Sequence, residues 1–266
     1  MSGPGDGAPV PRPAATVVIL RDGRDGLEVF MVVRHHEIDF ASGALVFPGG
    51  KVDQQDFDPA WAELAPSAAG APDRAFLVAA ARETFEEAGL VLARRRGAAH
   101  LLDAEAAHRL VERYRRPLLA GATRFLDLVR AENLLLAPDL MVPFAHWITP
   151  VTQPKRFDTH FLLVSAPVEQ LGAHDGGESV EGFWIAPAQA LRDAEAGART
   201  LVLPTQMNLT KLARHATVPD AVAAARASPI VTVTPRIERL PDGRKLHIPL
   251  EAGYGVSEVV VTSRKR

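Results

Sequence analysis

The pattern of apolar and polar positions in the first fifty residues predicts β-strands. Residues 16–20 and 27–33 are runs of β-branched and other apolar residues, and the turn-rich residues 21–26 separate them. Two such runs around a short turn are typical of a β-hairpin. Residues 44–47 form another short apolar run, which ends at residues 48–50, Pro-Gly-Gly, because proline and glycine interrupt regular structure.

The middle and the end of the chain predict a mixture of helices and strands. Residues 51–72 are polar and rich in Ala and Pro, so we expect a surface insertion with one helical turn around Trp61. Asp73 is the expected N-cap of a helix that runs to about Ala88, and Gly89 is expected to end it in the left-handed conformation. The later elements expected are one or two amphipathic helices over 94–133 with Asp103 and Thr123 as caps, strands at 146–151, 160–165 and 180–185, a helix over 204–215, and strands near 230–233 and 245–250.

This order of elements predicts an α+β fold, a mixed β-sheet layered with helices. We expect a tail without regular structure at residues 1–13, which are rich in Gly, Pro and Ala. Residues 14–266 are expected to form a single domain, with insertions at about 51–72 and 94–140.

Composition restricts the possible functions. The hydrophobic share of 47%, the charged share of 23% and the net charge of -2 are those of a globular protein without general attraction to nucleic acid or anionic membranes. The absence of cysteine excludes disulfides, thiolate metal sites and cysteine nucleophiles. No apolar run approaches the ~18 residues of a membrane span. The run Arg94-Arg95-Arg96 is expected to be a solvated helix start rather than a nucleic-acid site, because no aromatic residues are interleaved with it.

The helix over 73–88 carries the candidate chemistry. At 100° per residue, Glu83, Glu86 and Glu87 lie within roughly 100° of one another, because positions i, i+3 and i+4 are neighbours on a helix. Ala79 and Ala80, one turn earlier on the same side, are expected to leave room for a ligand. The opposite face is expected to pack against the core, and it consists of Leu77, Val78, Ala81, Thr84, Phe85 and Ala88.

Three carboxylates at this spacing repel one another by ~0.2–0.5 kcal/mol per pair. Divalent cations such as Mg²⁺ and Mn²⁺ would neutralise them, because these ions prefer oxygen ligands. Arg82 is expected to pair with Glu86 at i+4. The spacing by itself is equally typical of a solvated acidic helix end, so both interpretations stay open at this point.

The surrounding residues resemble the signature of a known family. Residues 82–90, Arg-Glu-Thr-Phe-Glu-Glu-Ala-Gly-Leu, resemble the second half of the Nudix box, and residues 47–50, Phe-Pro-Gly-Gly, resemble its opening. This resemblance implies the Nudix fold and metal-dependent cleavage of a diphosphate bond. It also implies that Glu83, Glu86 and Glu87 ligate Mg²⁺ or Mn²⁺ together with a backbone carbonyl of the glycine pair, assigned to Gly50, and that Arg82 orients the glutamates.

The chain departs from the box in two ways. The family has a glutamate eight residues before the arginine, and here Arg74 stands in that position, with Asp73 beside it. The segment between the glycines and the helix, residues 51–72, is also longer than usual. This elongated box is similar to a subgroup of peroxisomal coenzyme A diphosphatases of the nudix motif 19 type, and so are residues 147–150 (Trp-Ile-Thr-Pro) and 156–159 (Arg-Phe-Asp-Thr).

The resemblance implies a small nucleotide-type substrate, and coenzyme A or acyl-coenzyme A is the first expectation, followed by NADH or ADP-ribose. Of the family's coenzyme A pattern, Arg34, Gly43 and Phe47 keep their places, but Asp39 stands where a second arginine is expected. Arg34, Gly49, Gly50 and Arg156 are the expected substrate-binding residues. The expected general base is Glu83 or an acid on a loop, for which Glu178 is preferred, with Glu181 as its neighbour.

Two other functions are compatible with the same residues. A nucleotide-binding module without catalysis would explain Arg74 in place of an acid, and it would bind ligand without releasing product. A metal-free interaction protein would leave the helix carboxylates merely solvated. Dimerisation is common in the family, and a homodimer stays open here. We expect a cytoplasmic protein, because residues 263–266, Ser-Arg-Lys-Arg, are not a peroxisomal address.

Overall fold

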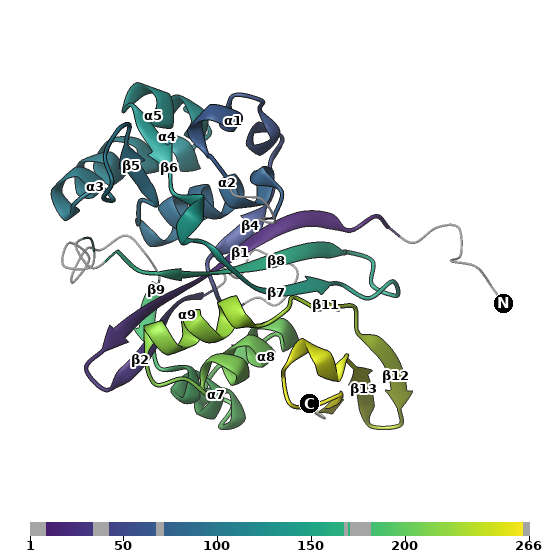
Figure 1. Ribbon diagram of the computed structural model, residues 1–266. Helices are drawn as coiled ribbons and strands as arrows, with labels where there is room; N and C mark the ends of the chain where they lie inside the picture. Colours follow the sequence, from purple (N-terminus) through teal and green to yellow (C-terminus); the bar gives the residue numbers. More distant parts are fainter. Residues whose placement is uncertain (1–8, 34–42, 68–71, 168–169, 171–181, 263–266) are drawn as a thin grey trace.

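The computed structural model describes residues 9–33, 43–67, 72–167, 170 and 182–262. Within these residues, nine strands form one mixed sheet with helices on both faces (Figure 1). Its strands are β1 (Arg12–Gly23), β2 (Gly26–Val33), β3 (Ala44–Val46), β4 (Gly49–Lys51), β7 (Val142–Ile148), β8 (Phe157–Ser165), β9 (Gly182–Ile185), β10 (Thr200–Leu201) and β11 (Thr232–Val233). The predicted α+β class is therefore confirmed.

Two smaller sheets flank the large one. The first contains β5 (Ala93–Arg95) and β6 (Leu134–Leu136), and the second contains β12 (Arg236–Leu240), β13 (Gly243–His247) and β14 (Glu258–Thr262). The α-helices are α1 (Trp61–Leu64), α2 (Arg74–Glu83), α3 (Ala104–Leu110), α4 (Arg116–Leu119), α5 (Phe125–Ala131), α7 (Pro187–Glu195), α8 (Leu203–Leu212) and α9 (Val218–Ala227). Single 3₁₀ turns are η1 (Gln54–Phe57), η4 (Pro138–Leu140) and η5 (Leu250–Ala252), and single π turns are η2 (Thr84–Ala88) and η3 (Val111–Arg115).

The long strand β1 organises the large sheet. Its C-terminal half pairs antiparallel with β2 through a tight hairpin, as predicted, and its N-terminal half pairs antiparallel with β4. On its other side β1 runs parallel to β8, which is antiparallel to β7. Because β4 and β8 both lie next to β1, residues around Gly50 and around His160 are placed at the same level of the sheet.

Each face of the sheet has its own apolar core. On one face, alternate β1 residues such as Val17 and Ile19 pack with α1 to α5. On the other face, Val18 and Leu20 pack with α7, α8 and α9. A strand that is apolar at successive positions fits burial on both faces, and the predicted sandwich of the sheet between helices is therefore confirmed.

The segment after the glycine pair is partly a core element and not only a surface insertion. The expected helical turn around Trp61 is present as α1. The Trp61 side chain is buried against Phe125 of α5, with ring centroids 5.9 Å apart, and Leu64 and Ala65 are buried as well. The polar composition of residues 51–72 concealed this packing because the buried positions are few and irregularly spaced.

Three other expectations differ from the structure. Arg94 and Arg95 lie in β5 instead of starting a helix, and the Arg94 guanidinium makes two 2.7 Å hydrogen bonds to the Asp139 carboxylate. Helix α5 begins at Phe125 with Arg124 as its N-cap, so Thr123 is not the cap, whereas Asp103 caps α3 as expected. Strand β1 begins at Arg12, inside the segment expected to be a tail.

No described helix combines the length and the apolar character that crossing a bilayer requires. The single-domain assignment stays a prediction.

A buried hydrogen-bond chain ties the C-terminal segment to the large sheet. The Trp147 indole N–H donates to the Tyr254 hydroxyl at 2.8 Å, and that hydroxyl donates to Oδ1 of Asn208 at 3.0 Å. Replacing Tyr254 by Phe leaves two buried polar groups without this partner, and each such loss costs about 1–3 kcal/mol. We therefore expect Tyr254→Phe to lower the free energy of unfolding by about 2–6 kcal/mol, the sum of the two losses, in a urea titration. Tyr114→Phe is the matched control, because the Tyr114 hydroxyl bonds Glu132 in a half-buried position, and a control loss as large as the Tyr254 loss would contradict this account.

Candidate metal centre on the carboxylate helix

The carboxylate helix forms as its sequence predicts, with one addition. Asp73 caps α2 by accepting a hydrogen bond from the Ala75 N–H at 3.1 Å, and the alanine-rich interior favours a helix. The last turn widens into the π turn η2, and Gly89 ends it in the left-handed conformation with φ of 65°. Single π turns within α-helices are frequent at functional sites. Here the π turn contains Glu86 and Glu87.

The glycine pair of β4 lies against the carboxylates of this helix. The Gly49 N–H donates to Oε2 of Glu87 at 2.9 Å, across 38 positions of sequence. Gly49 has a φ of 154°, and a Cβ there would lie 2.5 Å from the Ala15 carbonyl oxygen, so the position requires glycine. At Gly50 a Cβ would lie 2.4 Å from Oε1 of Glu83. The two separated halves of the box are thus in direct contact.

The close approach of the Glu83 carboxylate to Gly50 leads to a testable prediction. In Gly50→Ala, the added methyl group would displace the Glu83 carboxylate, which Arg82 holds with a 2.7 Å hydrogen bond. A displacement of about 1 Å at a catalytic group costs on the order of 10²-fold in rate, so we expect turnover to fall by about that factor. Steady-state kinetics would measure this. Gly121→Ala is the control, because alanine strains the backbone there, at a φ of 68°, without meeting any atom within 4 Å of its Cβ. Equal turnover in the two variants would show that the space beside Glu83 is not needed.

Arg82 connects the carboxylates to one another. Its side chain is buried, and its Nη1 donates to Glu83 Oε1 at 2.7 Å and to Glu86 Oε2 at 3.3 Å. The expected i,i+4 pair with Glu86 is therefore present. Nη2 also donates to the Lys51 carbonyl oxygen of β4 at 3.0 Å. The guanidinium thereby fixes both the helix and the glycine strand.

The sequence did not reveal the main partner of Arg82, which is Asp56 of η1. Asp56 accepts from Nε at 3.2 Å and from Nη2 at 2.9 Å, and its side chain is fully buried. Arg82 therefore has a buried acidic partner from outside the helix, although position 74 itself is an arginine. Arg74 has another contact, since its Nε donates to the Ala65 carbonyl at the end of α1. The only signal in the sequence was an acid within the elongated segment, where Asp53 and Asp58 offered equal alternatives.

Burial and charge oppose each other within this cluster. Burial alone would lower the pKa of Arg82, but the hydrogen bonds and charge of Asp56 and the charges of Glu83 and Glu86 raise it above its usual value. Burial raises the pKa of Glu86 to about 7, and the charge of Glu83 adds to this against the effect of Arg82. Burial also raises the pKa of Glu83. One arginine therefore does not fully compensate the carboxylates, which favours binding of a further cation.

The helical segment after β5 contributes a second arginine that sequence analysis missed. Arg115 of η3 donates from Nε to the Glu86 carbonyl oxygen at 2.7 Å. Burial lowers its pKa, although the charges of Glu87 and Glu86 act in the opposite direction. This guanidinium therefore lies at the helix end that carries Glu86 and Glu87.

The other residues expected at the site have different outcomes. Arg156 donates to the carbonyl oxygens of Thr149 and Pro9, and its expected role in binding substrate stays a prediction. Ala79 and Ala80 are fully buried in the core, so the room expected beside them is filled. Arg34, Asp39, Glu178 and Glu181 lie outside the described residues.

A mixed sheet between helices, with a glycine strand against a glutamate helix, is the arrangement expected of the Nudix fold. The family model described as NUDT19 Nudix domain matches residues 70–212, more than half of the chain, so the chain belongs to this Nudix family. A crystal structure of a NUDIX hydrolase from Alicyclobacillus acidocaldarius superposes with a TM-score of 0.60 at 26% identity, covering 83% of this chain and 99% of that one.

Two curated relatives carry the name acyl-coenzyme A diphosphatase NUDT19. The protein from Gallus gallus is 27% identical over 73% of this chain, and the protein from Xenopus laevis is 22% identical over 71% of it. These alignments span 63% and 60% of the relatives' own lengths. The family match begins at residue 70, beyond the glycine pair and Asp56, so the contacts of these residues with the helix come from the structure alone.

Proposed function

We propose that this protein is a metal-dependent diphosphatase that cleaves a nucleoside diphosphate linked to another moiety. The observation that carries the proposal is the contact between the carboxylate helix and the glycine strand. Glu87 accepts from the Gly49 N–H, Glu83 lies against Gly50, and Arg82 holds Glu83 and Glu86. Acidic side chains that are merely solvated would not be buried around a shared arginine.

The donor set fits a hard divalent cation. Glu83, Glu86, Glu87 and the Gly50 carbonyl offer only oxygen atoms, as Mg²⁺ and Mn²⁺ prefer. The missing side chain of Gly50 lets the Glu83 carboxylate lie directly against the glycine strand. When bound, such cations neutralise diphosphate oxygens and lower the pKa of the attacking water. Hydrolysis adds one water, breaks one P–O bond of the diphosphate bridge and yields two products that each keep one phosphate of the bridge.

The chain's own residues orient the reacting groups. Arg82 fixes the directions of the Glu83 and Glu86 carboxylates, and the Gly49 N–H fixes that of Glu87. Arg115 supplies a positive charge at the same helix end, suited to a phosphate oxygen. Among the acids proposed as general base, Glu83 is in place in the cluster, and Glu178 stays the proposed alternative.

Coenzyme A or acyl-coenzyme A is the first proposed substrate, and NADH or ADP-ribose come next. The names of the NUDT19 relatives support this order. Asp39, where the coenzyme A pattern has arginine, remains the reason to test the others. A cytoplasmic location and a homodimer stay predictions.

One experiment tests the proposal. The purified chain is offered coenzyme A, acyl-coenzyme A, NADH, ADP-ribose, dinucleoside polyphosphates and NTPs with Mg²⁺ or Mn²⁺, and products are identified by mass spectrometry. From coenzyme A or acyl-coenzyme A we expect adenosine 3′,5′-bisphosphate and the matching 4′-phosphopantetheine, and no product in EDTA. Binding of a nucleotide without any product would instead identify a non-catalytic module, and failure to bind either metal in calorimetry would remove the basis of the proposal.

A further inference from the structure

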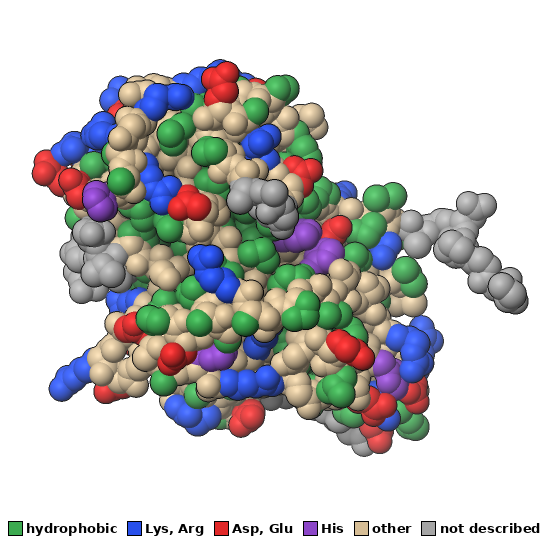
Figure 2. Space-filling view, viewed as in Figure 1, with side chains coloured by type: hydrophobic (Ala, Val, Ile, Leu, Met, Phe, Trp, Pro, Cys, Tyr) green, Lys and Arg blue, Asp and Glu red, His purple; other side chains and the backbone are tan. Residues whose placement is uncertain are grey.

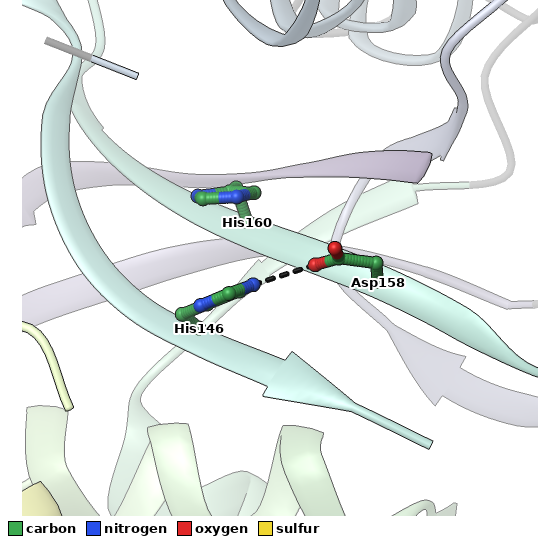
Figure 3. Close-up of side chains that lie close together, drawn as sticks. All are labelled: His146, Asp158 and His160. Carbon is green, nitrogen blue, oxygen red and sulfur yellow. Dashed lines mark hydrogen bonds and ion pairs between the residues drawn. The ribbon is translucent and has the colours of Figure 1, made fainter. Parts of the chain in front are cut away.

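A second group of metal-ligand residues lies on the same face of the sheet as the carboxylate helix. His146 of β7 and His160 of β8 are directly opposite each other in the antiparallel register. Their rings stack with centroids 4.1 Å apart and planes 19° apart (Figure 3). Asp158, two residues before His160, points to the same face, because side chains alternate along a strand.

Hydrogen bonds hold this group in place. The Nε2 of His146 lies 2.5 Å from Oδ1 of Asp158, and its Nδ1 lies 2.8 Å from the Thr232 hydroxyl of β11. On the other side, Phe76 of α2 packs edge-on against His160 with centroids 4.4 Å apart. One ligand atom from each of His146, Asp158 and His160 lies within 4.8 Å of the other two.

The group is reachable from solvent. All three residues are only partly buried, and the side chains of His146 and Asp158 are 15% and 34% exposed. Figure 2 shows histidine side chains at the surface over the part of the sheet where β7 and β8 run in Figure 1. An ion therefore has a path to the group.

An ion pair between His146 and Asp158 accounts for two of these three residues, but not for the position of His160. Asp158 and His146 would suffice as a structural pair, but His160 adds a second imidazole to the same spot. Histidine imidazole is the commonest side-chain ligand of metal ions in proteins.

We propose that His146, Asp158 and His160 bind a transition-metal ion of the Zn²⁺ or Co²⁺ class, separately from the glutamates of α2. Two imidazoles and one carboxylate favour such ions over Mg²⁺. With Nε2 of His146 on the ion, its Nδ1–H donates to the Thr232 hydroxyl, which is the usual outer contact of a ligating histidine. Since the rings are nearly parallel, one imidazole has to turn about its terminal torsion, which is a broad and inexpensive rotation.

The two sites are neighbours on the sheet without sharing a ligand. The register runs from Gly50 through Ala15 to His160 and on to His146. Gly50 and His160 are therefore two strand spacings apart, roughly 10 Å. The proposal stands independently of the diphosphatase proposal, because its donors and its preferred ions are different.

Cobalt titration of the full chain tests the site. Co²⁺ is added in saturating Mg²⁺, which occupies the glutamates, and binding is followed by visible d–d absorption. We expect one Co²⁺ per chain. In His160→Phe, which keeps a ring against Phe76, we expect Co²⁺ affinity to fall by at least about 100-fold, and in Thr232→Val by about 10–100-fold.

Two controls make the test specific. Glu86→Gln is expected to keep the absorption, and so is His247→Phe, because His247 also pairs with carboxylates, Glu238 and Glu258, but lies outside the group. If His160→Phe fails to fold, Asp158→Asn replaces it with the same expected loss. Absence of d–d bands at saturating Co²⁺, or equal affinities in His160→Phe and His247→Phe, would overturn the proposal.

Discussion

Glu86→Gln is expected to lower turnover of the substrate by on the order of 10²–10⁴-fold while the protein stays folded. A bound cation contributes several kcal/mol of transition-state stabilisation, and each 1.36 kcal/mol corresponds to a factor of ten in rate. Gln keeps the shape and one oxygen of Glu86 but removes the charge that would hold the cation. Turnover at saturating Mg²⁺ or Mn²⁺ measures the effect.

Stability separates this loss of activity from a loss of fold. Because burial raises the pKa of Glu86 to about 7, its charged form is disfavoured in the metal-free protein. Removing the charge should therefore leave the thermal midpoint of metal-free Glu86→Gln equal to or above that of the wild type. Glu105→Gln is the control, since Glu105 lies on α3 and is 85% exposed. Full turnover in Glu86→Gln would place the chemistry elsewhere on the chain.

Asp56→Asn is expected to reduce both stability and turnover. Asp56 is buried and accepts two hydrogen bonds from Arg82, and removing one partner of such a buried pair costs about 3–5 kcal/mol because the buried guanidinium loses its main acceptor. Arg82 would then hold Glu83 and Glu86 less well, and a displacement of about 1 Å costs on the order of 10²-fold in rate. Urea unfolding and steady-state kinetics on the same preparation measure the two effects.

Asp53→Asn provides a matched control for the charge. Asp53 lies 3.8 Å from the same Arg82 nitrogen, but its side chain is 54% exposed, so its contribution is expected to be about 0–1 kcal/mol. If the two variants lose equal stability, Asp56 does not anchor Arg82. If Asp56→Asn loses stability but keeps full turnover at saturating cation, the pair stabilises the fold without positioning the glutamates.

The helix and its carboxylates could be predicted because their signals are local. The cap Asp73, the terminating Gly89 and the spacing of Glu83, Glu86 and Glu87 all follow from the geometry of a single helix. The hairpin of β1 and β2 could be predicted for the same reason, since two apolar runs flank a turn.

Segments whose sequence lacks a regular pattern of apolar and polar positions were predicted less well. The polar composition of residues 51–72 predicted a surface segment, but the Trp61 side chain is buried in the core. Arg94 and Arg95 were expected to start a helix, but pairing with β6 places them in a strand. Tertiary pairing outweighs local propensity where a segment is short.

The sequence by itself determined the helix that carries Glu83, Glu86 and Glu87 and the hairpin of β1 and β2, because each depends on residues a few positions apart. Only the tertiary structure decided that Asp56 is the partner of Arg82, that Arg115 reaches the helix end and that His146, Asp158 and His160 meet on one face. These contacts join segments 12 to 29 positions apart or lie across neighbouring strands. Periodicity carries no information about such pairs, because the register of a sheet and the docking of a loop are set by packing of the whole chain.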